Sequence, residues 1–353
     1  MNDARLRCVI RAPSAAGLLL ALLSCQGKGE SGSAAASAKA AVPAPAASAA
    51  VGAAPRPSQA PAAASISAAA AASGAAVPAP PFTADPQRYP WLQDSREFPK
   101  PDATLQARFP TPPGYARVSV EPGSFAEWLR SLPMAPEGTP AKSFDGKETL
   151  AGDDDYLAGV VAIDVGTSDL QQSSDVIVRL HAEYLWSRGE RDKISYLSAT
   201  KLNMPLSRWE KGQRLIANGA SVFWAVKGKP AEIDHAEFRK YLDSIFNWAN
   251  SSSLSPRSTP VTDPKELLAG DFFLQSQSPN HVAIVLDLAE KPSGERVALL
   301  GQARNPAESI HVVRPGKATP WFSVRPPVPV LTPHSQALAW GDLRRLGPAE
   351  PEK

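Results

Sequence analysis

A long stretch of low-complexity sequence most limits what this chain can fold into. From Ser31 to Pro81 the residues are almost all Ala, Ser, Pro and Gly, with few charges and no aromatic side chain. Such a segment cannot bury enough apolar surface to offset the entropy that is lost on ordering. The sequence therefore predicts a disordered linker over residues 25–81 and a single folded domain over residues 82–348, which is long enough to bury about three quarters of its surface.

The composition of the linker suits an extended tether. Pro-rich chains extend by up to roughly 3.1 Å per residue, so the linker can hold the domain well away from whatever anchors the N-terminus. The alternative is a filler without a role, which predicts the same disorder. Composition alone does not decide between the two.

The first residues have the features of a targeting signal. Three arginines precede an apolar run over residues 15–23, which is too short to span a bilayer as a mature helix. The run ends at a small residue followed by Cys25, and this arrangement resembles the lipobox of bacterial lipoproteins. The resemblance implies a signal peptide over residues 1–24 and a lipid attached to Cys25. The alternative is an ordinary cleaved signal with an incidental cysteine.

The residues around Cys25 also bear on location and redox chemistry. Cys25 is followed by Gln26 and not by the Asp that tends to retain lipoproteins in the inner membrane of Gram-negative cells. The resemblance thus implies a lipid-anchored protein of the cell envelope, on the outer membrane and facing the periplasm. Cys8 and Cys25 are the two cysteines of the chain, so the domain has no disulfide, no cysteine-ligated metal and no thiol nucleophile.

Charge and motifs narrow the range of partners. From residue 82 onward the chain carries 31 Lys and Arg against 33 Asp and Glu. Nucleic-acid binding needs a basic face, so nucleic acid is not expected as a partner. The sequence has no phosphate-binding loop and no dinucleotide glycine pattern, and we expect no cofactor and no metal. The expected partners are the membrane, through the lipid anchor, and peptidoglycan or other envelope proteins.

Hydrophobic periodicity separates a helical part of the domain from a strand-rich part. Apolar residues three and four positions apart predict helices that begin near Ser124, at Asp169 and at Ala236, with a short strand at 160–165. The last third instead predicts short strands at 271–275, 281–288, 296–301 and 310–313. We therefore predict an α+β fold in which N-terminal helices pack on an antiparallel sheet formed by the C-terminal third.

Two segments stand out as a candidate site. The first is Asp169-Leu170-Gln171-Gln172-Ser173-Ser174-Asp175, and the second is Gly270-Asp271-Phe272-Phe273 followed by Asn280-His281-Val282-Ala283-Ile284-Val285. The second resembles the active-site strand of papain-like cell-wall hydrolases, the NlpC-type endopeptidases and the CHAP amidases. The resemblance implies a papain-like core with a nucleophile in the first turn of a helix, a histidine at the head of a strand and a polar orienting residue on the next strand. In this chain the matching positions are Ser173, His281 and Gln302.

A longer part of the domain, from about Tyr115 to Leu346, is similar to an uncharacterised bacterial lipoprotein family, the domain of unknown function 4846. The similarity lies in Ile163-Asp164-Val165-Gly166, Asp169-Leu170-Gln171-Gln172, Arg179-Leu180-His181-Ala182-Glu183-Tyr184-Leu185, Ser207-Arg208-Trp209, Phe238-Arg239-Lys240-Tyr241-Leu242, the His281 strand, Gln302 and Ile310-His311-Val312. In that family the position matching Ser173 is commonly a cysteine.

The serine at position 173 changes the chemistry that the resemblance implies. The pKa of a hydroxyl lies far above that of a thiol, and a helix dipole worth roughly 0.3–1 kcal/mol cannot make an alkoxide. Serine hydrolases place a carboxylate behind the histidine, whereas Gln302 is neutral. We therefore expect impaired or absent hydrolysis of amide bonds in cell-wall peptides, in a cleft that still binds its ligand.

Each candidate also has a purely structural interpretation. Ser173 can cap its helix, His281 can be a strand-end histidine satisfied by backbone groups, and Gln302 can be a half-buried amide bonded to backbone. For the whole protein the alternative is a non-catalytic envelope scaffold that binds protein or glycan, which the eight Trp suggest and which predicts an exposed aromatic patch. A third hypothesis is a serine hydrolase whose carboxylate comes from Asp164, Asp169 or Asp271.

Overall fold

The structure is a computed structural model that describes residues 82–275, 281–332 and 337–348. The predicted signal peptide over residues 1–24, Cys25 and the predicted linker over residues 25–81 lie outside the described residues and stay predictions. Within the described ranges, no helix is long and apolar enough to cross a bilayer.

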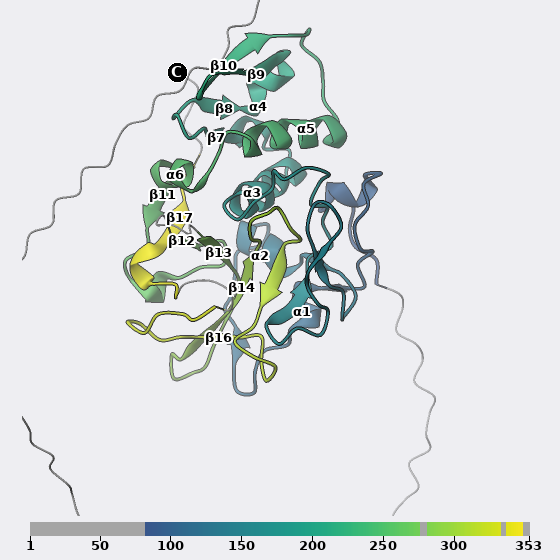
Figure 1. Cartoon of the computed structure of the whole chain (residues 1–353). Helices are drawn as coiled ribbons and strands as arrows, with labels where there is room; N and C mark the ends of the chain where they lie inside the picture. Colours follow the sequence, from purple (N-terminus) through teal and green to yellow (C-terminus); the bar gives the residue numbers. More distant parts are fainter. Residues whose placement is uncertain (1–81, 276–280, 333–336, 349–353) are drawn as a thin grey trace, which may run out of the picture. The chain divides into compact units, whose positions relative to one another are not determined.

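The domain is built on a nine-stranded sheet in which neighbouring strands are antiparallel. The strand order is β11–β17–β12–β13–β14–β15–β6, with β16 also beside β14 and β2 also beside β13. The long strands β13 (His281–Glu290) and β14 (Arg296–Gln302) lie at its centre (Figure 1). The other strands are β2 (Ala116–Arg117), β6 (Leu157–Val160), β11 (Ser258–Pro260), β12 (Phe272–Gln275), β15 (His311–Val313), β16 (Phe322–Val324) and β17 (Leu343–Leu346).

The mixed α and β class and the large antiparallel sheet are confirmed, but the sheet is not formed by the C-terminal third alone. Strands β2 and β6, which come from the first half of the domain, pair with β13 and β15. The strand predicted at 160–165 ends at Val160, because Val161 and Ala162 donate their amides to two different segments, at Ile310 and Pro133. The apolar residues after Val160 are buried, as the sequence predicts, but they do not continue the strand.

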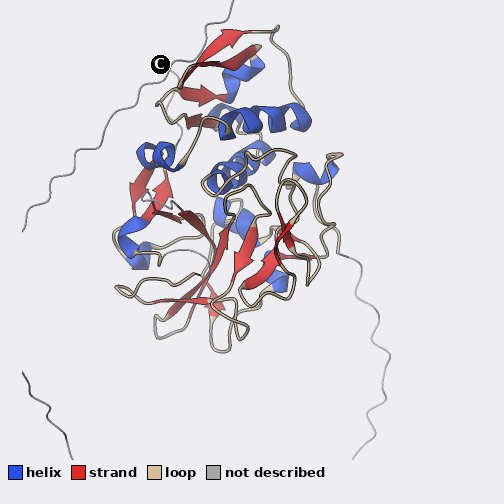
Figure 2. Cartoon of the chain, in the orientation of Figure 1, coloured by secondary structure: helices blue, strands red, loops and turns tan. Residues whose placement is uncertain are grey.

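The helices are concentrated in the middle of the chain and not at its N-terminal end. The two long ones are α3 (Asp175–Ser187) and α5 (His235–Phe246). Their arrangement relative to the sheet is seen in Figures 1 and 2. The short helices are α1 (Leu105–Arg108), α2 (Phe125–Arg130), α4 (Leu206–Glu210) and α6 (Ser251–Leu254), with 3-10 turns at Pro90–Gln93, Arg191–Lys193, Ser255–Arg257, Pro264–Glu266 and Trp340–Asp342.

Four small antiparallel pairs of strands lie outside the nine-stranded sheet. They are β1 (Ala103–Thr104) with β3 (Pro133–Met134), β4 (Ala141–Lys142) with β5 (Glu148–Leu150), β7 (Ser195–Leu197) with β8 (Asn203–Pro205), and β9 (Gln213–Asn218) with β10 (Ser221–Val226). The last pair forms the hairpin at the top of Figure 1.

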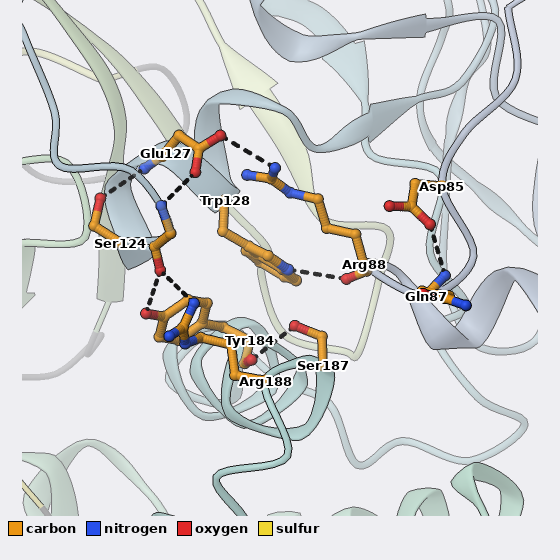
Figure 3. A pocket seen from close by; sticks show the side chains of 10 residues that line it. Asp85, Gln87, Arg88, Ser124, Glu127, Trp128, Tyr184, Ser187 and Arg188 are labelled. Atoms are coloured by element: carbon orange, nitrogen blue, oxygen red, sulfur yellow. Dashed lines mark hydrogen bonds and ion pairs between the residues drawn. The ribbon is translucent and has the colours of Figure 1, made fainter.

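Helix α2 begins where the sequence predicts. The Ser124 side chain accepts a hydrogen bond from the Glu127 amide at 3.2 Å, as an N-cap residue does. The Glu127 carboxylate reaches one residue further back than a capping box requires, and accepts from the Gly123 amide at 2.7 Å. Figure 3 shows both bonds. The local signal therefore fixes the start of the helix although the reciprocal partner differs.

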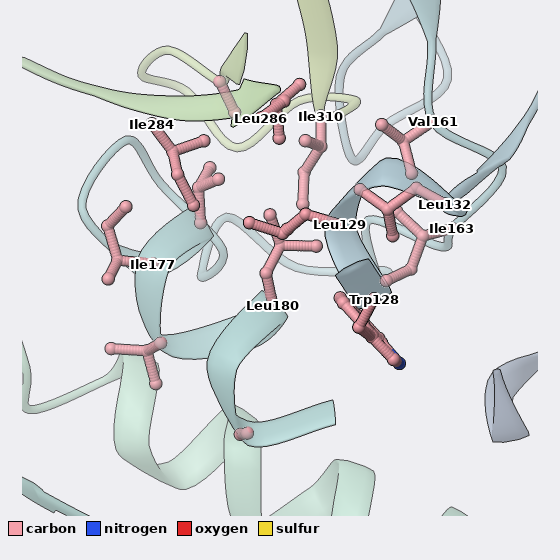
Figure 4. Packing of buried hydrophobic residues seen from close by; sticks show 14 of the residues in the cluster. Trp128, Leu129, Leu132, Val161, Ile163, Ile177, Leu180, Ile284, Leu286 and Ile310 are labelled. Atoms are coloured by element: carbon pink, nitrogen blue, oxygen red, sulfur yellow. The ribbon is translucent and has the colours of Figure 1, made fainter. Parts of the chain in front are cut away.

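The hydrophobic core lies between one face of the sheet and helices α2 and α3. Leu129 of α2, Leu180 of α3 and Ile284 of β13 meet there (Figure 4). The opposite face of the sheet is also covered, by Val261, Leu267, Val330 and Leu338 over the strand residues Phe273, Ala283, Val285 and Leu300. Since both faces are buried, the central strands have almost continuous apolar sequences.

Helix α3 lies between the sheet and α5, and a chain of buried and partly buried charges crosses it. Asp164 accepts from Arg179 at 2.7 Å, and Arg179 also donates to Glu183 at 2.9 Å. Glu183 and Asp94 then hold the two ring nitrogens of His235, at 2.8 and 2.9 Å. We call these five residues the buried charge network. It ties the segment before α1 to both long helices.

Candidate functional site

Ser173 stands just before helix α3 and not in its first turn. The helix begins at Asp175, later than the predicted start at Asp169. Asp169 accepts a hydrogen bond from the Ala307 amide at 2.7 Å, and Asp175 accepts one from the Gln172 amide at 3.1 Å. These two carboxylates fix the turn that carries Ser173. The sequence signal for a turn is correct here, but its partners include a distant loop that sequence spacing cannot reveal.

The three predicted site residues come together in one hydrogen-bonded chain. The Ser173 hydroxyl oxygen lies 3.4 Å from Nδ1 of His281, and Nε2 of His281 lies 2.8 Å from Oε1 of Gln302. The Ser173 oxygen also accepts from the Val282 amide at 3.0 Å. All three side chains are buried, with exposed fractions of 5, 7 and 1%. The order serine, imidazole, amide is the one that the sequence predicts.

The sheet register explains how His281 and Gln302 meet. His281 opens β13 and Gln302 closes β14, and pairing of these two strands runs from Ile284 opposite Gly301. Val282 lies outside the pairing between β13 and β14, and its amide donates to Ser173. Gln302 is the direct partner of His311 on β15. Because side chains alternate along a strand, His281, Gln302 and His311 share one face of the sheet.

Burial favours the neutral form of the His281 imidazole. Removal from water lowers the pKa of His281, and this outweighs the hydrogen bond to Gln302, which favours the protonated ring. A neutral imidazole has one protonated nitrogen and one lone pair. With Nε2 donating to the Gln302 oxygen, the lone pair is on Nδ1, which faces the Ser173 hydroxyl. In chemical terms the ring can accept the hydroxyl proton.

A loop between β14 and β15 binds the backbone amide of Ser173. The amide oxygen of Asn305 accepts a hydrogen bond from the Ser173 amide at 3.1 Å, although Asn305 is itself exposed. The loop is held on either side of Asn305, because Glu308 accepts from the Arg304 guanidinium at 2.9 Å and Asp169 accepts from the Ala307 amide. The backbone amide of Ser173 is therefore occupied by the protein itself.

The carboxylates that were candidates for a serine-hydrolase triad have other partners. Asp164 belongs to the buried charge network, Asp169 holds the Ala307 amide, and Asp271 pairs with Arg345 at 2.7 Å. Glu308 lies 3.8 Å from Nδ1 of His311, the residue paired with Gln302, and Arg304 already binds it. The side chains bonded to the two His281 nitrogens, Ser173 and Gln302, are neutral.

Comparison with known proteins identifies the family. The family described as a domain of unknown function (4846) matches residues 105–345. The protein belongs to this family. The match covers Ser173, His281, Gln302 and His311. Searches of curated proteins and of solved structures found no match.

Two of the cavities in the described part of the chain lie as follows. One, of about 250 Å³, is lined by Arg88, Glu127, Trp128 and Tyr184 among others, and an Arg88–Glu127 ion pair of 3.1 Å crosses it (Figure 3). The other, of about 1190 Å³, lies between residues 82–101 and the loops at 139–146 and 163–167. Neither cavity is lined by Ser173, His281 or Gln302.

The tryptophans that suggested a scaffold are buried or half-buried. All eight lie within the described residues, and none is exposed. Trp91, Trp128, Trp209 and Trp321 are buried, and the other four are half-buried. The exposed large apolar side chains of the described residues are Tyr156, Phe223, Val226, Leu268, Val328 and Leu331. The exposed aromatic side chains among them are Tyr156 and Phe223, and no tryptophan joins them.

Sequence reasoning missed two residues of the site. Asn305 stands in a loop without any motif, and only the three-dimensional structure connects it to Ser173. His311 was noted as part of the family pattern, but no role was attached to it. The signal that points to its role is its position nine residues after Gln302 on the next strand, because a short connection between antiparallel strands brings its two ends opposite each other.

Proposed function

We propose that this domain is a papain-like member of the amide-hydrolase type, with Ser173 in the nucleophile position and impaired catalysis. In this proposal the protein is a lipoprotein anchored through Cys25, and its ligand is an amide-bearing peptide of the cell envelope. The observation that carries the proposal is the chain of Ser173, His281 and Gln302 at 3.4 and 2.8 Å. A base within hydrogen-bond reach of a hydroxyl, itself oriented by a third group, is the general arrangement of nucleophilic catalysis.

The reaction that this arrangement suits is acyl transfer. Ser173 would bond to the carbonyl carbon while Nδ1 of His281 takes the hydroxyl proton. The same proton would then pass to the nitrogen of the leaving amine as the amide bond breaks. Water, activated by the same imidazole, would release the acyl group and regenerate Ser173. Water is the one co-reactant that this sequence needs.

Two features of the site argue that the native protein performs this reaction poorly. No carboxylate faces His281 among the described residues that bond to it, so the imidazolium that forms would be stabilised only by a neutral amide. The Ser173 amide, which would stabilise the oxyanion, donates to Asn305 instead. Both features slow the cleavage step in this proposal.

The test compares the native full-length protein with Ser173→Cys. Each is incubated with purified peptidoglycan, and released peptides are identified by mass spectrometry. We expect little or no release by the native protein and clear release by Ser173→Cys, because a thiol ionises far more readily than a hydroxyl beside the same imidazole. The matched control is Ser174→Cys, which places a thiol one residue away on a side chain that is also buried.

The outcomes separate the alternatives. Release by Ser173→Cys that is lost when His281→Gln is added supports the proposal. Equal release by Ser174→Cys would show that the thiol and not the site is responsible. Efficient release by the native protein would show that catalysis is not impaired. If no variant cleaves or binds peptidoglycan, the proposed ligand class is wrong.

A further inference from the structure

We propose that His311 is a positioning residue which fixes the tautomer of His281 through the amide of Gln302. The proposal rests on the proposed function in one respect, because it gives that tautomer a role in proton transfer from Ser173. The geometry itself stands apart from any activity. Gln302 bonds to His281 on one side, at 2.8 Å, and its amide nitrogen lies 3.3 Å from Nε2 of His311 on the other.

The Ser173 hydroxyl cannot decide which nitrogen of His281 carries the proton. A hydroxyl can donate one hydrogen bond and accept two. One accepting position on Ser173 is taken by the Val282 amide, which leaves the oxygen able either to donate to Nδ1 of His281 or to accept from it. Both tautomers of His281 are therefore compatible with Ser173, and only one of them leaves a lone pair for the hydroxyl proton.

The Gln302 side chain cannot decide by itself either. An amide presents an oxygen that accepts on one side and a nitrogen that donates on the other, and a half-turn about the last bond exchanges them. With the oxygen toward His281, the ring must carry its proton on Nε2. With the nitrogen toward His281, the proton must lie on Nδ1, where the ring can no longer act as a base toward Ser173.

His311 removes this ambiguity because one of its nitrogens faces a backbone carbonyl. Nδ1 of His311 lies 2.9 Å from the carbonyl oxygen of Ser309. A carbonyl oxygen only accepts, so Nδ1 of His311 carries a proton; the proposal takes the ring as neutral, with its lone pair on Nε2. The Gln302 nitrogen must then donate to His311, and its oxygen must face His281. The Ser309 carbonyl thus sets the direction of each hydrogen bond from His311 through Gln302 to His281.

Burial makes the direction of these bonds energetically significant. His311 and Gln302 are exposed by 0 and 1%, so water cannot replace a lost partner, and a reversed amide would leave two donors or two acceptors facing each other. Glu308 lies 3.8 Å from Nδ1 of His311, and its carboxylate also binds Arg304. The surroundings therefore favour the single arrangement seen in the structure.

The test measures the tautomer of His281 directly by NMR. The full-length protein is labelled with ¹⁵N in its histidine rings, of which the chain has five, and the His281 signals are assigned by their loss in His281→Gln. Ring ¹⁵N chemical shifts distinguish a protonated nitrogen from one with a lone pair. We expect the native protein to carry the His281 proton on Nε2. A native protein with the proton on Nδ1 would overturn the proposal.

Two variants at position 311 test the role of this residue. His311→Phe keeps the ring shape but has no acceptor for the Gln302 amide, and we expect the ratio of the two His281 tautomers to change by roughly fivefold, as the loss of one hydrogen bond implies. His311→Gln restores an acceptor on a longer side chain, and we expect it to return the ratio toward the native value. A merely structural role for His311 predicts that both variants lose stability without any change in the tautomer ratio.

A second measurement keeps this proposal separate from the proposed function. In the Ser173→Cys background, alkylation of the introduced thiol by iodoacetamide is followed by peptide mapping, which distinguishes that thiol from Cys8 and Cys25. We expect His311→Phe to slow this alkylation at neutral pH and His311→Gln to restore it.

The outcomes distinguish failure of one proposal from failure of the other. If Ser173→Cys never cleaves peptidoglycan but the tautomer ratio and the alkylation rate both follow residue 311, the ligand class fails and the positioning role stands. If neither quantity responds to His311→Phe, the positioning role is wrong, whatever the protein does to peptidoglycan.

Discussion

Two polar assemblies meet helix α3, and they are built on opposite principles. At its N-terminal end, Ser173, His281, Gln302 and His311 form a chain of neutral groups, each of which can donate or accept. Along its body, the buried charge network pairs cations with anions. Charges hold one arrangement because the alternative leaves an unpaired ion. Neutral groups can form their hydrogen bonds in either direction, so one fixed acceptor at the end of the chain sets that direction.

The comparison predicts that the charge network carries stability while the neutral chain carries chemistry. Arg179 and Glu183 are fully buried, whereas the removal of one neutral hydroxyl or amide costs the protein much less. Each of the following predictions changes one assembly and leaves the other intact, so that the two can be separated by experiment.

The largest effect is expected for Arg179→Ala. This change removes the cation that the buried carboxylates of Asp164 and Glu183 share, leaving them with Arg239 at 3.4 Å and His235 at 2.8 Å, and should lower the free energy of unfolding by about 3 kcal/mol. Denaturant titration of the full-length protein measures this. Arg191→Ala is the matched control, because its guanidinium stacks on Trp186 at the surface, 4.0 Å from the ring centre, and should cost no more than about 1 kcal/mol. Equal losses in the two variants would contradict the comparison.

Gln302→Glu converts the neutral chain into a charged one. A carboxylate in place of the amide would face Nε2 of His281, and should raise the pKa of that imidazole by about 1 to 3 pH units, from a value that burial now holds below the ordinary one. A histidine NMR titration follows the change. Gln302→Leu is the control, since it removes the hydrogen bond without adding charge and should not raise the pKa. An unchanged pKa in Gln302→Glu would mean that residue 302 does not face the ring in solution.

His235 gives the charge network a dependence on pH. Burial alone would lower its pKa, but the charge of Glu183 and the hydrogen bonds to Asp94 and Glu183 outweigh burial and raise the pKa to about 9. Its contribution to stability is therefore complete below about 6.5, the unfolded value, and is lost as pH rises through about 9. We expect the free energy of unfolding to fall by at most about 1.4 kcal/mol per pH unit in this window.

The control for this pH effect is His235→Asn, which cannot titrate and should flatten the slope between about pH 6.5 and 9. Denaturant titrations at several pH values give the slope for each protein. A native protein whose stability rises across this window would show that His235 is not protonated in the folded state. His281 should act in the opposite direction and mainly at and below about pH 6.5, because its folded pKa is lowered and the unfolded ring takes up a proton that the folded ring does not.

The smallest effect on stability is expected for Ser173→Ala. Only the hydrogen bond from the Val282 amide and the contact with His281 are lost, so the free energy of unfolding should fall by about 1 kcal/mol. Ser174→Ala is the neighbouring control. A loss from Ser173→Ala as large as that from Arg179→Ala would mean that Ser173 is kept for folding and not for chemistry.

The two assemblies also differ in how far the sequence revealed them. Ser173, His281 and Gln302 were predicted to meet because the segments that carry them resemble the active-site segments of papain-like hydrolases. The charge network was not predicted, because Asp94 precedes the first α-helix and its partner His235 opens α5. No local pattern links residues so far apart.

The fold shows the same division. Helices α2 and α5 and strands β12 to β15 follow from capping residues and periodicity, which act within a few positions. The addition of β2 and β6 to the sheet does not, because edge pairing depends on which distant backbone is left unpaired. The late start of α3 has a similar cause, since Asp169 is bound to the Ala307 amide and not to the first turn of its own helix.

The spacing between Gln302 and His311 has a consequence for how this site can vary among descendants of one ancestor. One stretch of ten residues, from 302 to 311, contains Gln302, Asn305, Glu308 and His311. Recombination that replaces this stretch would therefore transfer Gln302, its partner His311 and Asn305, which binds the Ser173 amide, in one step. An insertion or deletion inside that stretch would instead pull apart Gln302 and His311, which are direct partners across two strands. We therefore expect substitutions to accumulate in this loop while its length stays constant.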